Sequence, residues 1–253
     1  MSTPQHIINQ QFNGTIWRLE IDEVTETLFA EIRDETEKQV SFSSIDLISG
    51  KTWFKGLTTP ERWLTGIETA YNGVLLLHNY QSAAGPSHKG LIAISGVSSE
   101  TLWSNYIYAF DHLTINGPIV YDTRIHPKKL FLADVKTGAT TRIYEPSVYS
   151  EIKNNIVAPQ IVAPEFLPSK LLPVAAYGNS VHYLEYSNFR IVSLHTLQAG
   201  QLKQCLYVID GMHVFYEDLL NTDIHKLQPE AFILHKNRLI YIKNKSQLIV
   251  INL

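Results

Sequence analysis

Apolar and polar positions along this chain follow one phrase that occurs five times. Each copy is an apolar strand, a short polar turn that usually contains glycine, and a second apolar strand. The clearest copies are SSIDLISGKTWF (43–54) and LFLADVKTGATTRIY (130–144), and looser copies begin at residues 91, 191 and 239. Repetition at this scale is typical of architectures in which one supersecondary unit is copied along the chain. The pattern therefore predicts an all-β repeat protein.

The spacing of the copies predicts the size of the repeating unit. The residues just before the five turns are Asp46, Ile94, Asp134, His195 and Lys243, at intervals of 40 to 61 residues. A four-stranded β-propeller blade takes about 40–50 residues, so we expect one propeller domain over residues 1–253 with five blades. The longest interval contains the Pro-rich stretch 145–173, expected to be an inserted loop that covers either the channel mouth or the rim. Six shorter blades are the alternative, if this stretch holds two strands of its own.

The turn residues support tight hairpins. Gly50, Gly138 and Gly200 allow the positive φ that a sharp reversal requires. Asp46 and Asp134 can accept backbone N–H groups from the turn, as Asx turns do. We therefore expect the last two strands of most units to be joined by a reversal of this kind.

Each unit divides into four expected strands, separated by turn signals such as Asp210-Gly211. In the fourth unit the strands are expected at 156–163, 180–185, 190–195 and 201–209. In the fifth they are expected at 212–218, 230–235, 238–243 and 248–253. The tryptophans that follow two of the turns, Trp53 and Trp103, are expected to wedge between neighbouring sheets.

Two of the copies also resemble a known signature. IDLISGKTW (45–53) and LADVKTGATTRIY (132–144) resemble the A-x-D-x-x-T-G-x-x-x-W motif of quinoprotein-type and WD40-like β-propellers. The resemblance is confined to the third and fourth strands of some blades, and it implies the propeller fold. The chain length and N-terminus are also similar to an uncharacterised family of propeller-like proteins from Bacteroidetes, a domain of unknown function. Quinoprotein dehydrogenases need a secretion signal, calcium-ligating carboxylates and commonly a vicinal cysteine pair, so their cofactor is not carried over and none is expected.

Composition narrows the classes of partner. The net charge is −3, only 18% of residues are charged, and the longest basic run is Lys128-Lys129, which argues against nucleic-acid binding. The single cysteine, Cys205, excludes an intramolecular disulfide and is expected to be a buried thiol. The first residues lack the pattern of a signal peptide, and the apolar runs are too short to span a bilayer. We expect a bacterial cytoplasmic protein without membrane contact.

In a propeller, the first strand of each blade lines the central channel. The loops that enter it share a face with the loops between the second and third strands, and ligands usually meet this face. The candidates there mix aromatic, basic and imidazole groups, as binding surfaces do: Glu61, Arg62, Trp63, Tyr108, His112, Arg124, His126, His213 and Tyr216. For the run 61–63, a salt bridge capping a core tryptophan is the structural alternative.

The ten histidines do not form a local metal-binding motif. H-x-H, H-x-x-H and H-E-x-x-H are all missing from the sequence, and the closest pairs, such as His78 and His88, are ten or more residues apart. A metal site would have to be assembled from separate blades, so no metal is expected.

A hydrolase would need carboxylates in the channel, one with a raised pKa as the acid and one ionised. Asp111, Glu217 and Glu68 are the candidates by position, and no catalytic motif surrounds any of them. The sequence therefore favours a non-catalytic scaffold that binds a protein or a small ligand on one face. A glycosidase-like hydrolase that uses these carboxylates is the alternative.

Overall fold

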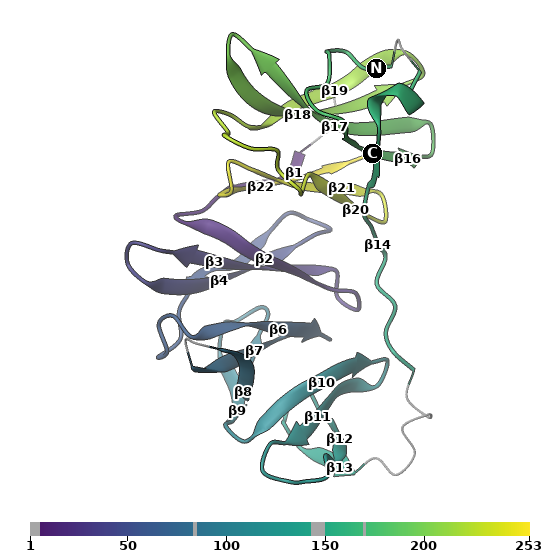
Figure 1. The fold of residues 1–253 in the computed structure, drawn as a ribbon. Helices are drawn as coiled ribbons and strands as arrows, with labels where there is room; N and C mark the ends of the chain where they lie inside the picture. The colour runs from purple at the N-terminus through teal and green to yellow at the C-terminus, as the bar shows by residue number, and fades with distance from the viewer. Residues whose placement is uncertain (1–5, 83–84, 143–149, 169–170) are drawn as a thin grey trace. The chain divides into compact units, whose positions relative to one another are not determined.

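The computed structural model describes residues 6–82, 85–142, 150–168 and 171–253. These residues form an all-β fold of five antiparallel sheets, each with four or five strands (Figure 1). The predicted all-β class and its five propeller-type blades are confirmed.

The first three sheets are four-stranded meanders, as expected for propeller blades. The first sheet contains β2 (Thr15–Asp22), β3 (Thr27–Asp34), β4 (Gln39–Asp46) and β5 (Thr52–Leu57). The second contains β6 (Thr65–Tyr71), β7 (Val74–Ser82), β8 (Gly85–Ser95) and β9 (Thr101–Asn105). The third contains β10 (Tyr108–Thr114), β11 (Gly117–Asp122), β12 (Leu130–Ala133) and β13 (Thr140–Arg142), and the expected continuation of its last strand to 144 lies outside the described residues.

The last two sheets are divided differently from the prediction. The fourth contains β15 (Gln160–Val162), β16 (Val181–Tyr186), β17 (Phe189–Gln198), β18 (Gln201–Asp210) and β19 (His213–Asn221). The fifth contains β14 (Ile156–Val157), β20 (Phe232–His235), β21 (Arg238–Lys243), β22 (Gln247–Asn252) and β1 (His6–Gln11). The purple strand β1 and the yellow strand β22 come from opposite ends of the sequence and pair (Figure 1).

The expected start of the fifth unit at 212–218 is therefore wrong. Only Gly211 and Met212 separate β18 from β19, and Asp210 pairs directly with His213. A two-residue loop makes a hairpin whose strands must pair with each other, so β19 becomes a fifth strand of the fourth sheet. The fifth sheet is completed by β1 and β14 instead.

The described part of the Pro-rich stretch contains more than a loop. It holds β14, β15 and the 3-10 helix η2 (Pro164–Phe166), while 145–149 and 169–170 lie outside the described residues. Because β14 and β15 join the fifth and fourth sheets, the described residues form no sixth sheet.

The described residues group into two compact units. Residues 13–154 contain the first three sheets, and residues 6–12 with 155–253 contain the last two. Each unit is described by itself, and the predicted single domain stays a prediction. In the described part of the chain, no helix has the length and apolar character of a membrane span.

The apolar run of β7 arises because the second sheet is buried on both faces. In β7, Leu75 and Leu77 pack into one cluster with Phe29 and Phe42 of the first sheet. Residues on the other face, Val74 and Leu76, pack into a second cluster with Val135, which follows β12. Successive side chains of a strand point to opposite faces, so a sheet covered on both sides needs apolar residues at nearly every position.

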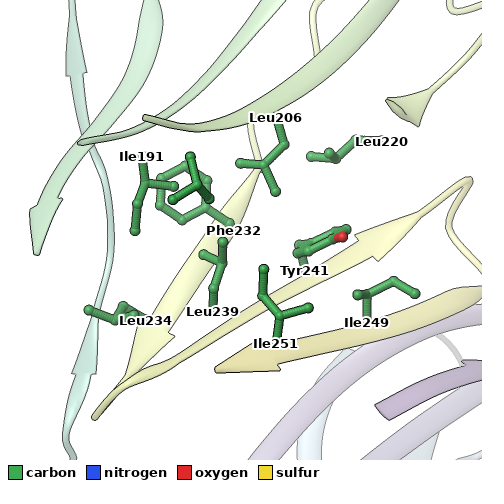
Figure 2. Packing of buried hydrophobic residues seen from close by; sticks show 10 residues of the cluster. Ile191, Leu206, Leu220, Phe232, Leu234, Leu239, Tyr241, Ile249 and Ile251 are labelled. Atoms are coloured by element: carbon green, nitrogen blue, oxygen red, sulfur yellow. The ribbon is translucent and has the colours of Figure 1, made fainter. Parts of the chain in front are cut away.

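The other unit has a similar core between its two sheets. Leu206 from β18 and Leu220 from β19 pack with Phe232, Tyr241 and Ile249 of the fifth sheet (Figure 2). All of these residues are at least nine-tenths buried. Cys205 is a buried free thiol, as predicted, and burial raises its pKa.

The predicted turn chemistry is confirmed. Oδ1 of Asp134 accepts the backbone N–H groups of Lys136 and Thr137 at 3.0 and 2.8 Å, and Asp46 does the same in its own turn. Gly138 has φ +72°, a left-handed conformation. Trp103 wedges between the second and third sheets as expected. It packs into two hydrophobic clusters, and in one of them Leu91 of the second sheet meets Val120 of the third.

Candidate binding site on the second sheet

Strand pairing in the second sheet brings together a carboxylate and two imidazoles that are distant in the sequence. Glu68 lies on β6, His78 on β7 and His88 on β8; we call these three residues the Glu68 cluster. The pairing of β6 with β7 shifts between Ile67 and Thr69, so Glu68 is an extra residue in its strand. A β-bulge of this kind redirects a side chain out of the regular alternation.

A second irregularity places His88. The pairing of β7 with β8 shifts after His78, and beyond that point Tyr80 lies opposite His88. Residues directly opposite one another on paired strands share a face of the sheet. Because Tyr80 follows His78 by two positions, His78, Tyr80 and His88 all lie on the same face.

The geometry of the cluster is compact. Oε2 of Glu68 lies 3.1 Å from Nδ1 of His78 and 2.8 Å from Nδ1 of His88. The two imidazole rings stack with centroids 3.5 Å apart and planes 7° from parallel. Tyr80 meets both rings edge-on, at 4.7 and 5.2 Å between centroids. The cluster extends from the core to the surface, with exposed side-chain fractions of 2% for His78, 10% for Glu68 and 33% for His88.

The electrostatics of the cluster keep its carboxylate ionised. Burial acts to raise the pKa of Glu68, but polar contact with His78 and the charges of His78 and His88 outweigh it, so this pKa is lowered. His78 is less well satisfied. Neither of its ring nitrogens makes an aligned hydrogen bond to any described residue, and Nδ1 has only the ionic contact with Glu68.

His78 occupies space that Gly66 leaves free. The two residues are paired across β6 and β7, and a Cβ built on Gly66 would lie 3.0 Å from Nε2 of His78. A larger residue at position 66 would therefore push the imidazole away from the cluster.

The Glu68 cluster borders a pocket, which we call the cationic pocket. Its cavity has a volume of about 280 Å³ and is lined by Gln81, His88, Lys89, Ile107, Thr123 and Arg124. Arg124 is held by two hydrogen bonds to Asp122, from Nε at 3.0 Å and from Nη2 at 2.8 Å. These hydrogen bonds lower the pKa of Asp122 to about 2, so the pair stays charged at any ordinary pH.

Other predicted residues on the third sheet form a separate group. Asp111 contacts both the Lys128 ammonium and Nδ1 of His112, the latter at 2.7 Å. Burial acts to raise the pKa of Asp111, but Lys128 and His112 outweigh it and the pKa is lowered. The Tyr108 hydroxyl lies 3.3 Å from Oγ1 of Thr140. The predicted residue His126 is exposed.

The run 61–63 supports local structure. Oε1 of Glu61 accepts the backbone N–H groups of Trp63 and Leu64, each at 3.2 Å. Arg62 donates to the backbone carbonyl of Glu37 at 3.3 Å. The cations over the Trp63 ring are Lys38, at 4.9 Å from the ring centroid, and Arg33, at 5.1 Å. Cations therefore cap the tryptophan, but the described contacts of Glu61 and Arg62 are with the backbone and do not include the expected salt bridge.

The remaining candidates lie in the other unit, all on β19. His213 and Glu217 are exposed, whereas Tyr216 is half-buried and its hydroxyl lies 2.7 Å from that of Tyr241. Glu217 lines a second cavity of about 310 Å³ with Cys205, Tyr207, Asp218 and Leu219. The structure therefore divides the predicted face between two units: only Arg124 of the predicted binding residues lines the cationic pocket, and Glu68 lies next to it.

The carboxylates proposed for a hydrolase have environments that suit other roles. Glu68 and Asp111 each contact cationic or imidazole groups that lower their pKa. A general acid needs the opposite shift. These contacts favour the ionised form of both carboxylates.

Comparisons with known proteins describe the chain at the level of the fold. Residues 21–103 match the family model described as a domain of unknown function (DUF4905), which covers about a third of the chain. This range includes all three residues of the Glu68 cluster. No curated protein matches the sequence.

Several solved structures show a distant similarity. BamB from Moraxella catarrhalis is 8% identical, over 93% of this chain and 84% of that chain, with a TM-score of 0.35. An endo-arabinase from Bacteroides thetaiotaomicron is 10% identical, over 100% of this chain and 97% of that chain, with a TM-score of 0.29. TM-scores this low say nothing about function. The fold of this chain is defined by its own strand order.

Sequence reasoning missed His78 and His88 as a site because it looked for ligands in separate blades. The structure assembles them within one blade, on adjacent strands. The signal available was the regular spacing of Glu68, His78 and His88, ten residues apart within the second expected unit.

Proposed function

We propose that this protein is a binding module that holds a small anionic ligand, one that bears a carboxylate or phosphate group, in the cationic pocket. Ligand sites are typically concave, with a few convergent polar groups, and start at about 300 Å³. The cavity here, about 280 Å³, is slightly smaller than that.

The observation that carries the proposal is the pairing of Arg124 with Asp122. Two hydrogen bonds orient the guanidinium, although most of the side chain is exposed. An oriented guanidinium can donate its free N–H groups to a carboxylate or phosphate in a fixed geometry. Lys89 adds a second positive charge to the lining, and His88 and Gln81 add polar groups.

The proposal keeps the non-catalytic scaffold that the sequence favours and assigns it a small ligand rather than a protein. A pocket between two sheets of one unit encloses a small molecule, whereas a protein partner would need a broad patch. The cytoplasm supplies many such anions, and a cytoplasmic location is part of the proposal.

The test is a calorimetric titration of metal-free protein with a panel of small carboxylates, sugar acids and sugar phosphates. At least one should bind, and Arg124→Gln and Lys89→Gln should each weaken binding by about tenfold or more, as expected for a lost charge-assisted contact of about 1.5–3 kcal/mol. Arg62→Gln, which removes an exposed arginine outside the pocket, is the matched control and should not change the affinity. The proposal is wrong if no anion binds, or if Arg124→Gln and Arg62→Gln have the same effect.

A further inference from the structure

We infer that Glu68, His78 and His88 form a binding site for a divalent transition metal ion of the zinc type. The inference is independent of whether the neighbouring pocket binds an anion. It stands on three ligand atoms, one from each residue, that all lie within 4.8 Å of one another.

The donor set selects the class of metal. Imidazole nitrogen with one carboxylate suits Zn²⁺ and similar ions, whereas Mg²⁺ and Ca²⁺ prefer oxygen ligands throughout. Two histidines and a glutamate are also one of the known three-ligand sets of zinc proteins, in which the fourth position is left for water or another molecule. His88 lines the cationic pocket, so the open position would be reached from there.

The hydrogen bonding of His78 indicates that something is missing between the side chains. The ring is almost fully buried, and its Nδ1 lies 3.1 Å from a carboxylate oxygen without an aligned hydrogen bond. A buried polar atom without a partner is costly. A metal ion bound by Nδ1 and by the carboxylate would satisfy both atoms.

The arrangement of the two rings also fits a shared ligand. Both imidazoles turn Nδ1 to the same oxygen of Glu68, and the rings stack at 3.5 Å. A single ion bound by the two Nδ1 atoms and this carboxylate oxygen would give all three atoms one common partner.

Binding requires one movement. A metal ion lies close to the plane of each imidazole that binds it, whereas the two rings here are parallel. The buried His78 is fixed by its packing on Gly66, so the partly exposed His88 must tilt out of the stack. This movement would change the edge-on contact of His88 with Tyr80, now 5.2 Å between centroids.

The experiment is a titration of the full chain, first freed of metal by dialysis against a chelator, with Co²⁺ alone and then with Zn²⁺ in competition. One Co²⁺ per chain should bind with visible d–d bands, and one Zn²⁺ should displace it. Glu68→Gln and His88→Gln should each weaken binding by more than about 100-fold, since loss of an outer-sphere partner alone costs about 10–100-fold. The test uses these two variants and no His78 variant, because His78 is buried and its substitution can unfold the chain.

The matched control is His112→Gln. His112 has the same exposed fraction, 33%, and the same Nδ1 contact with a carboxylate, but among the described residues it belongs to no group of three possible metal ligands. Its substitution should leave Co²⁺ and Zn²⁺ binding unchanged.

Three outcomes would overturn the inference. They are no Co²⁺ or Zn²⁺ binding below about 0.1 mM, binding of Mg²⁺ or Ca²⁺ as tight as that of Zn²⁺, and equal affinities for the parent, His88→Gln and His112→Gln. Because this titration contains no organic anion and the anion titration contains no metal, each proposal can fail without the other.

Discussion

Gly138 and Trp103 offer a direct test of how the second and third sheets pack. Nε1 of Trp103, on β9, donates to the carbonyl oxygen of Val135 at 2.8 Å. The ring covers Gly138 so closely that a Cβ built there would lie 2.8 Å from ring atom Cδ2. Gly138 also has φ +72°, which disfavours any other residue. Gly138→Ala therefore carries two separate penalties, one from the backbone and one from the tryptophan.

Gly56 isolates the backbone penalty within the same unit. It has φ +74°, and nothing lies within 4 Å of the Cβ it would gain. A left-handed φ costs a non-glycine residue about 1–2 kcal/mol, partly offset by about 0.4–1 kcal/mol from the stiffer unfolded chain. Gly56→Ala should lower the free energy of unfolding by about 1 kcal/mol on this basis. Forcing a methyl group into a packed contact adds about 1–3 kcal/mol, so Gly138→Ala should cost more by that amount.

Urea unfolding followed by circular dichroism measures both losses, and a double-mutant cycle with Trp103→Ala separates them. Trp103→Ala alone should cost about 3–5 kcal/mol, as truncation of a packed tryptophan usually does. In the Trp103→Ala background the ring is absent, so Gly138→Ala should lower the free energy of unfolding only by the backbone penalty. Equal losses for Gly138→Ala and Gly56→Ala, or a loss below about 1 kcal/mol for Trp103→Ala, would refute the packing described here.

Two further predictions concern the unit that contains the fourth and fifth sheets. Nε2 of His195 accepts the backbone N–H of Gln228 at 2.9 Å, and burial lowers the pKa of this imidazole. Because the unfolded chain takes up the proton near the ordinary value of about 6.5, the free energy of unfolding should be highest above that pH and fall below it. His195→Gln should remove this part of the pH dependence in urea titrations, and an unchanged slope would contradict the assignment. The Asp218 carboxylate accepts the Tyr241 hydroxyl at 2.7 Å and the Lys243 ammonium at 2.6 Å. Asp218→Ala should lower the free energy of unfolding by about 1–3 kcal/mol, and a loss within about 0.5 kcal/mol, as for an ordinary surface change, would show that these contacts add little.

The parts of the fold that depend on neighbouring residues could be predicted from the sequence. A tight reversal needs a residue that tolerates positive φ and a side chain that accepts the turn's N–H groups, and Asp134 with Gly138 supplies both four residues apart. The position of Trp103 between two sheets could also be predicted, because a large ring just after such a turn faces the next sheet. These constraints act within one hairpin, so the residues of that hairpin are enough to predict it.

The parts that depend on distant partners could not be predicted. β1 pairs with β22, from the other end of the chain, and its short polar sequence gives no sign of that partner. The pairing of β19 with β18 is an exception, because Asp210-Gly211 is a local hairpin signal that joins two strands of one sheet.

The Glu68 cluster was missed for another reason. Two irregularities in strand pairing bring its side chains together, and a one-residue shift moves every later side chain to the other face. Regular alternation cannot predict where such a shift occurs. Arg124 was predicted from its position on an expected face, and its contact with Asp122, two residues before it, was not predicted.

The buried pair of Glu31 and Arg33 can be compared with His78, because its hydrogen bonds are complete. Gly66 lies close to both clusters, since a Cβ there would meet His78 at 3.0 Å and Glu31 at 3.3 Å. Both carboxylate oxygens of Glu31 are used: Oε1 accepts Nε–H of Arg33 at 2.7 Å, and Oε2 accepts the backbone N–H of Ile67 at 2.9 Å. A buried ion pair satisfied in this way can hold two sheets together and has no capacity left for a ligand. His78 lies just as deep, yet its nitrogens make no aligned hydrogen bond to the described residues. Of these two clusters in the described residues, the one with Glu31 is satisfied by hydrogen bonds and the one with His78 is not, which is why the proposed metal ion is assigned to the second.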